Sequence, residues 1–507
     1  MLVLAAFAFV LPFTVVYYHI SPDDIETAAR VAIIPIFVLQ AVLLMLKGTF
    51  SVAAGVTQEA TEGVWDYQRL SPMTPLAKIV GYVLGLPIRE YILVALLFPF
   101  VMFASVKGDI PAGMIFRVYV VFFSVSILYH MSGFLAGVVV KKKILAGVLT
   151  QILVLSLNLI LPVIGNAGFA VFQYLTIYPV VFEQVLLLYP EIQNEWPEQM
   201  ALFYDWEFRP APFSIVAQQA IGLIFVVVVH RRMRNPANHL LGKHFSALTF
   251  CVLMAVLLGS VLPLIEDGMI FVTQAIQQYQ WDTRIIDRVP TEDGLVASAA
   301  FGLISLIAAV GFALIITPTL DNYRKGLRRS QKLKRAFQPL GADSALGTWH
   351  MLVIIVGGAV AWSLFNRAVF ESDQIQLPEL NSSYAVWITL VFALPLIASQ
   401  LVLESTGKKG FLMWAFFTWL VPILSAGVFC IVSESFVVPS IYLSSISGIA
   451  LCFFAAQESF PVTEDNYSSH IHIAFICGLF YQFIAAGFFG MLGVSQKRRV
   501  AREILDR

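Results

Sequence analysis

Charged residues are scarce in this sequence, in which only 13% of the 507 residues are Asp, Glu, Lys or Arg. A soluble domain carries about a quarter of its residues as charges. The 32 basic and 32 acidic side chains cancel, so the net charge gives no reason to expect nucleic acid as a partner. Hydrophobic residues make up 59% of the chain and its mean hydropathy is +0.81, which predicts a helical protein embedded in a lipid bilayer.

Cysteine and the common motifs of catalytic chemistry are also scarce. The four cysteines lie inside apolar runs without a C-x-x-C pair, which predicts neither a disulfide nor a metal site. His470 and His472 are two residues apart and do not share a helix face, and no third ligand accompanies them. No G-x-x-x-x-G-K-[ST] phosphate loop occurs, so we expect a chain that is not an enzyme and holds no cofactor.

Apolar runs long enough to cross a bilayer recur from one end of the chain to the other. The first has neither the basic flank nor the small-residue cleavage site of a signal peptide, so we expect it to be retained. Proline should break the third run near Pro87, because it removes a backbone donor. The predicted fold is an all-α polytopic membrane protein with about twelve transmembrane helices. These are residues 2–20, 31–54, 76–106, 114–140, 144–164, 213–229, 246–264, 294–316, 351–370, 384–403, 411–432 and 471–494.

Two further apolar stretches, residues 169–188 and 437–456, do not fit as full crossings. Basic clusters mark cytoplasmic loops, and they stay on one side of the membrane only if both stretches are re-entrant or external. This assignment predicts a protein of the plasma (inner) membrane with a cytoplasmic C-terminus. The clusters are residues 141–143, 231–234, 324–335, 408–409 and 497–502.

The same exception falls after the fifth span of each half, which indicates an internal duplication. The basic turns that precede the fifth spans, at residues 141–143 and 408–409, also correspond. We therefore expect a first six-span unit at residues 1–234, a cytoplasmic linker at 235–244 and a second six-span unit at 245–507.

The longest polar interruption in the first quarter of the chain, residues 58–81, separates the second span from the third. If residues 58–72 form a helix, four charged side chains recur at steps of three, four and three residues and share one face. Trp65 and Tyr67 add amphipathic rings that suit a membrane interface or a protein pocket. Prolines after Ser71 and Thr74 end the helix. The charged residues are Glu59, Glu62, Asp66 and Arg69.

This segment resembles the cytoplasmic coupling segment of the ABC type-2 exporter permeases. In that family an acidic stretch, a glycine, a short helix and a Leu-Ser-Pro-like stop precede a Lys-x-x-Gly start of the third span. Six spans with an external element between the fifth and the sixth are also the layout of a type-2 unit. The loop at the coupling position of the second half, residues 320–347, is basic and departs from the pattern. The matching residues of the first half are Glu59, Glu62, Gly63, Leu70, Ser71, Pro72, Lys78 and Gly81.

The resemblance implies a membrane-spanning permease subunit that exports a substrate by means of a separate ABC ATPase subunit. ATP and magnesium would be bound by that partner and not by this chain. Neither the substrate nor the formation of a homodimer follows from the sequence. The residues implied as contacts of the ATPase are Glu59, Glu62, Trp65, Asp66 and Arg69.

Two ionisable residues in the fourth apolar run, Arg117 and His130, are candidates for lining a translocation path, because such groups are costly to bury without partners. Two other classes of protein stay open. A secondary transporter would show broken spans with ionisable residues in both halves. A lipid-linked glycosyltransferase would use acidic residues of the first outer loop, where Asp23 and Asp24 lie.

Overall fold

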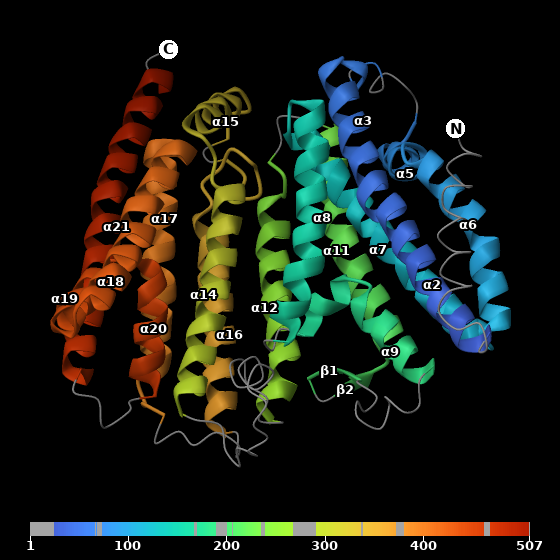
Figure 1. Ribbon diagram of the computed structural model, residues 1–507. Helices are drawn as coiled ribbons and strands as arrows, with labels where there is room; N and C mark the ends of the chain where they lie inside the picture. The colour runs from blue at the N-terminus through green and yellow to red at the C-terminus, as the bar shows by residue number, and fades with distance from the viewer. Residues whose placement is uncertain are drawn as a thin grey trace. The chain divides into compact units, whose positions relative to one another are not determined.

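The described part of the chain is almost entirely helical (Figure 1). Among the residues that the computed structural model describes, ten helices are long and apolar enough to cross a bilayer, or eleven if a bent pair of shorter helices counts as one span. The predicted all-α polytopic membrane fold is confirmed. The predicted first span, residues 2–20, lies outside the described residues. Those residues are 25–65, 67, 73–166, 170–188, 200–204, 206–234, 239–266, 291–335, 338–371, 380–460 and 467–505.

The chain divides into two compact units, residues 1–240 and 241–507. The boundary falls inside the segment 235–244, which is the linker predicted from the sequence. That each unit is a six-span permease stays a prediction.

In the first unit, a helical segment of 37 residues precedes the polar segment, and four candidate spans follow it. A π-helical stretch lies in the middle of the long segment, and a two-stranded antiparallel hairpin precedes the last span. The elements are α2 (Ile25–Ala41), η1 (Val42–Gly48), α3 (Thr49–Thr61), α5 (Pro75–Gly85), α6 (Ile88–Lys107), α7 (Ala112–Val139), α8 (Lys143–Asn166), η2 (Ala170–Leu175), α9 (Tyr178–Leu188), β1 (Ala201–Phe203), β2 (Trp206–Phe208) and α11 (Pro210–Arg234).

The second unit contains five of the candidate spans, one of which is 49 residues long. Such a helix extends about 74 Å, more than twice the hydrocarbon thickness of a bilayer. The backbone breaks at Gly407, whose φ of +73° is left-handed, and this break separates the predicted spans 384–403 and 411–432. The elements are α12 (Lys243–Glu266), α14 (Thr291–Ile316), α15 (Leu320–Lys332), α16 (Thr348–Glu371), α17 (Tyr384–Ala415), η3 (Phe416–Leu420), α18 (Val421–Val432), η4 (Glu434–Phe436), α19 (Val437–Ser444), α20 (Gly448–Ser459) and α21 (Ser468–Leu505).

The predicted break of the third span near Pro87 is confirmed. α5 ends at Gly85 and α6 begins at Ile88, with a turn between them. α5 begins where Thr74 accepts a hydrogen bond at its hydroxyl from the backbone N–H of Ala77. With 11 residues α5 is too short to cross a bilayer, whereas the 20 residues of α6 suffice.

The apolar stretches after the fifth spans contain short helices, as the re-entrant interpretation predicts. In the second unit, α19 and α20 bend by 110° relative to each other. Their 8 and 12 residues are too few for either helix to cross alone. In the first unit, the 3-10 helix η2 and the 11-residue α9 occupy the corresponding place in the sequence.

The two units share several helix neighbours. In the first, α7 packs against α3 and α11, and α2 packs against α6. In the second, α17 packs against α14 and α21, and α14 packs against α16. By order in the sequence, both units therefore pair the second span with the third and fourth, and the fourth with the sixth.

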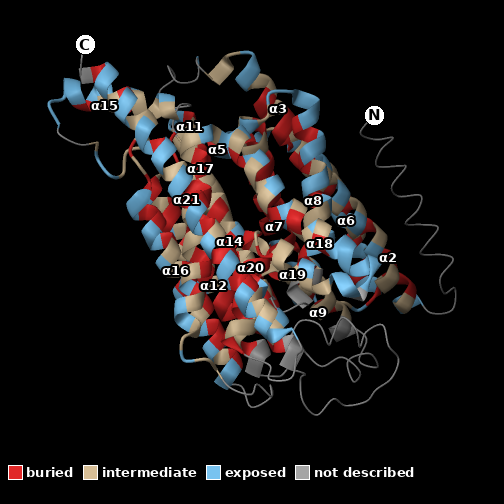
Figure 2. Ribbon diagram, turned by 90° about the vertical axis from the view of Figure 1, so that its left-hand side faces the viewer, coloured by how far each residue is buried: buried red, intermediate tan, exposed pale blue. Residues whose placement is uncertain are grey.

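Many large apolar residues of the described helices are exposed, and Figure 2 shows exposed residues recurring along the helices. On α6, for example, Ile88, Ile92, Leu96 and Phe103 are about half exposed. Contiguous apolar surface of this kind is unfavourable in water and suits lipid chains. Each of the described core clusters is built from helices of one unit.

Candidate functional site

The polar segment that follows α3 makes a turn and is not one amphipathic helix. α3 ends at Thr61 and is capped by Glu62. Gly63 then adopts a φ of +76°, the left-handed conformation that commonly ends a helix. The prediction of a single helix over residues 58–72 is therefore wrong.

The turn interrupts the segment that was predicted to form one helix with a charged face. Glu59 belongs to α3, whereas Trp65 lies beyond Gly63. Asp66 and Arg69 lie outside the described residues. Contact of these residues with an ATPase stays a prediction.

Hydrogen bonds tie the end of α3 to two other elements of the first unit. The Tyr82 hydroxyl of α5 donates to the Glu59 carboxylate. Gln58 donates from Nε2 to Glu62 Oε1 at 2.8 Å and accepts at its own Oε1 from Lys143 Nζ at 2.7 Å. The turn is therefore linked both to the start of the broken third span and to the basic turn before α8.

Trp65 packs into the helix bundle. Its ring stacks on Phe134 of α7, with centroids 6.3 Å apart and an interplanar angle of 27°. Tyr82 meets the same Phe134 ring edge-on at 5.3 Å. Trp65 also lies against the core cluster that contains Ile79 and Met233. The half-buried indole therefore anchors the turn to α5, α7 and α11.

The outward surface of the turn is carried by other side chains. Glu62 is exposed, and Tyr67 is 79% exposed. The ring of Tyr67 is recognisable in the sequence but was not predicted as an ATPase contact, and neither were Gln58 and Lys143. An aromatic ring beside a polar turn is a weak signal for Tyr67. The bond between Gln58 and Lys143 joins residues 85 positions apart, and no sequence pattern predicts it.

The second unit carries a basic amphipathic helix, α15, at the matching position between α14 and α16. Thr319 caps it by accepting a hydrogen bond from the backbone N–H of Asn322 at 3.3 Å. Arg324 Nη2 pairs with Glu503 Oε2 of α21 at 3.0 Å. The exposed basic residues of α15 are Lys325, Arg328, Arg329 and Lys332.

The buried carboxylate of Glu404 joins α17 to α21. The side chain of Glu404 is only 4% exposed and pairs with Lys497 Nζ at 2.5 Å. Gln400 Nε2 donates to the second Glu404 oxygen at 3.3 Å. Burial, and then the negative charge of Glu404, raise the pKa of Tyr323 on α15. A cavity of about 230 Å³ lies between residues 317–320 and 403–408 beside this pair.

His130 is fully enclosed by helices of the first unit. Its Nε2 lies 3.0 Å from the Leu44 carbonyl and its Nδ1 lies 3.3 Å from the Tyr91 hydroxyl. A carbonyl only accepts, so Nε2 carries the proton and Tyr91 donates to Nδ1. A Cβ at Gly48 would lie 2.6 Å from Nε2, and the absent side chain at that position makes room for the imidazole.

Arg117 is not close to His130. It lies half-buried near the start of α7, 13 positions before His130, which corresponds to about 20 Å along a helix. The structure therefore does not bring the two candidates for a translocation path together. Their role in such a path stays a prediction.

Glu90, which the sequence pairs with Arg89 as interfacial residues after the Pro87 break, is a buried ionisable residue that was not predicted as a site residue. It lies three residues after the Pro87 break and is 5% exposed, while Arg89 beside it is exposed. Ser51 Oγ donates to Glu90 Oε1 at 3.1 Å, and Oε2 has no hydrogen-bond partner among the described residues. The signal in the sequence was an acidic residue inside an apolar run, three positions after the proline that breaks it.

Within the described ranges, no group of three or more His, Cys, Asp or Glu side chains could hold a metal ion. Asp23 and Asp24, the acidic pair considered for a glycosyltransferase, lie outside those ranges. Comparison of the chain with protein-family models, with curated proteins and with solved structures found no match. The apolar helices decide the class. The chain is an integral membrane protein.

Proposed function

We propose that the chain is the membrane-spanning permease subunit of an ATP-driven exporter of the ABC type-2 class. The observation that carries the proposal is the repeated helix arrangement. In both units the fourth span packs on the second and the sixth, and short helices follow the fifth. A duplicated permease unit accounts for this repeat and for the bent pair of α19 and α20.

The turn between α3 and α5 is the proposed contact with a separate ATPase subunit. Its outward residues, Glu62 and Tyr67, would meet the ATPase directly. Trp65 and Glu59 would pass the displacement inward, because they bind Phe134 of α7 and Tyr82 of α5. Movement of α5 relative to α6 at the Pro87 break would then rearrange the spans.

The second unit would respond through α15. Its ion pair from Arg324 to Glu503 connects it to α21, and Lys497 connects α21 to Glu404 of α17. In this proposal ATP and magnesium are bound by the partner subunit. The protein lies in the plasma (inner) membrane, and the basic ends of both units are on its cytoplasmic side.

Purification from the native membrane in mild detergent tests the proposal. We expect an ATPase subunit in stoichiometric amount with the native chain. Glu62→Lys should lower the retained ATPase by about tenfold, because it reverses an exposed charge at the contact. Glu371→Lys is the matched control. Glu371 is also an exposed glutamate, and it lies at the last residue of α16, away from the end of α16 that follows α15.

Two outcomes would contradict the proposal at different levels. If both variants retained the ATPase equally, the proposed contact between the α3–α5 turn and the ATPase would be contradicted. A chain that purifies alone, after crosslinking as well, would remove the exporter assignment.

A secondary transporter is the second candidate, favoured by the buried Glu90 and by His130 close to the broken third span. Secondary transporters place ionisable residues at interrupted helices within the membrane. Uptake driven by an ion gradient in vesicles without ATP, and lost in Glu90→Gln, would favour this candidate. Transport that requires ATP and is insensitive to the gradient would exclude it.

A further inference from the structure

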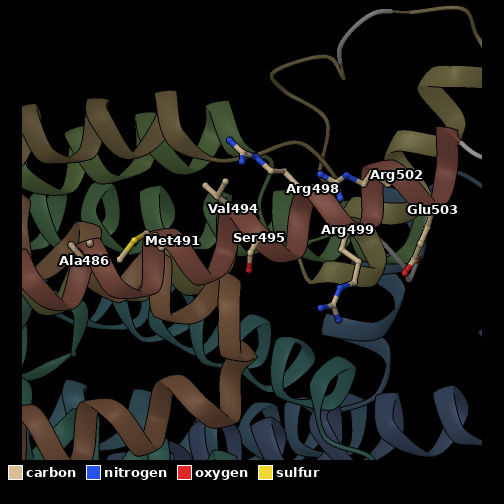
Figure 3. Close-up of a pocket in the computed structure, with 10 residues that line it drawn as sticks. Ala486, Met491, Val494, Ser495, Arg498, Arg499, Arg502 and Glu503 are labelled. Carbon is tan, nitrogen blue, oxygen red and sulfur yellow. The ribbon is translucent and has the colours of Figure 1, made fainter.

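A groove of about 870 Å³ runs along one side of α21 (Figure 3). Its lining residues recur in adjacent pairs at every fourth position, from Ala486 and Gly487 to Arg502 and Glu503. Residues four apart stack on one face of a helix. The lining is therefore a continuous stripe along five successive turns of the same helix.

The stripe changes character along its length. The pairs from Ala486 to Val494 are small or apolar, with a single hydroxyl at Ser495. Figure 3 shows that arginines continue the stripe beyond Ser495, toward the end of the helix. Met491 and Val494 are 70% and 47% exposed, so the apolar part is open at the surface of the unit.

Two glycines hollow the apolar part. A Cβ built at Gly487 would meet no atom within 4 Å. At Gly490 the nearest atom would be Leu401 Cδ1 at 3.5 Å, an ordinary contact. The space beside these glycines is therefore open and can accept a chain of methylene groups.

Three positive charges lie at the polar end of the groove without a counter-charge. No hydrogen bond or ion pair links Arg498, Arg499 or Arg502 to another residue that the structure describes. Glu503 is the acidic residue of the lining, and Arg324 already pairs with it at 3.0 Å. The charge of this end is complementary to an anion.

We propose that this groove is a binding site for an acidic phospholipid. The acyl chain lies along the stripe from Ala486 to Val494, and the phosphate of the headgroup is held by Arg498 and Arg502, which lie one turn apart. Arg499, which points to the other side of the helix, adds positive charge at the same end. The apolar part is about 12 Å long, close to the thickness of one leaflet of the hydrocarbon core. Guanidinium groups bind phosphate oxygens in a forked geometry, and basic pockets at the ends of spans suit acidic headgroups. The site does not depend on the proposed export function.

Lipid titration of the full-length protein tests the site. The protein in mild detergent receives phosphatidylglycerol or phosphatidylcholine with the same acyl chains, and native mass spectrometry counts the bound lipid. We expect preferential binding of phosphatidylglycerol. Substitution of all three arginines by glutamine should weaken that binding on the order of a hundredfold, because each basic residue contributes near an acidic headgroup.

Two further variants separate the groove from general surface charge. Gly487→Trp fills the open apolar part while the arginines stay, and it should weaken binding as well. Glutamine at Lys325, Arg328 and Arg329 removes three exposed charges from α15, outside the groove lining, and should leave binding unchanged.

Three outcomes would overturn the proposal. The first is an equal loss of binding in the α15 variant and the groove variants. The second is displacement of the lipid by inorganic phosphate at equal concentration, which would make the site an anion site only. The third is a photo-crosslinker at Met491 that captures protein and not lipid in native membranes, which would identify the groove as a protein interface.

Discussion

At the scale of single residues, Trp65 and Tyr67 have similar side chains and opposite surroundings. Both are aromatic residues of the turn after α3. Trp65 is half-buried on Phe134, whereas Tyr67 is 79% exposed. Stacking and burial should make Trp65 important for stability, and Tyr67 is free to contact a partner.

Trp65→Ala should lower the free energy of unfolding by about 1–3 kcal/mol, because it removes a half-buried ring from the bundle. Tyr67→Ala is the control and should change it by less than about 0.5 kcal/mol. Thermal unfolding of the detergent-solubilised protein measures both. Equal shifts in the two variants would show that the ring of Trp65 does not anchor the turn.

At the scale of elements, two glycines decide how closely α3 and α7 approach. Gly133 and Gly137 form a G-x-x-x-G pattern on α7, which brings membrane helices into backbone contact. A Cβ at Gly133 would lie 2.8 Å from the Thr49 carbonyl oxygen, and one at Gly137 would lie 2.8 Å from that of Ala53. α3 leads directly into the proposed coupling turn, so this contact also positions that turn.

Gly137→Ala should force α3 and α7 apart and cost about 1–3 kcal/mol, because the clash is with backbone that cannot rotate away. Gly113→Ala, on the same helix, is the control. A Cβ there meets nothing within 4 Å, and alanine should stabilise the helix by up to about 1 kcal/mol. A Gly137→Ala protein as stable as the Gly113→Ala protein would contradict close packing of the two helices.

At the scale of the whole molecule, the chain folds into two compact units, and the boundary between them follows Leu240. The cores described within each unit are built from that unit's own helices. Each unit should therefore keep its fold when the connection between them is cut.

A protease site inserted between Pro236 and Ala237 tests this independence. Cleavage there should leave the thermal unfolding midpoint unchanged. A site inserted between Leu340 and Gly341, inside the second unit where a Cβ at Gly341 would touch His244, is the control. Its cleavage should lower the midpoint by roughly 4 °C, the shift that about 1–2 kcal/mol causes in a domain of this size. Equal loss of stability after both cleavages would contradict two independent units.

Much of the fold could be predicted because membrane spans depend on local composition. Long apolar runs must form helices that satisfy their own backbone hydrogen bonds in lipid. Proline removes a backbone donor, which predicts the break at Pro87, although Pro99 lies inside the continuous helix α6. A glycine such as Gly63 permits a left-handed turn. The turn at Gly63 was still missed, because the spacing of the charged residues alone is compatible with a continuous helix across it.

The sequence by itself determined the membrane class, the positions of the described spans and the Pro87 break, since each is set by residues adjacent in the chain. Only the tertiary structure decided which polar side chains meet. Ser51 and Glu90 are 39 positions apart, and Gln58 and Lys143 are 85 apart. The groove of α21 likewise needed the structure, because only packing decides which face of a helix is left open. Contacts of this kind depend on how helices associate, and hydropathy carries no information about partners when every span is apolar.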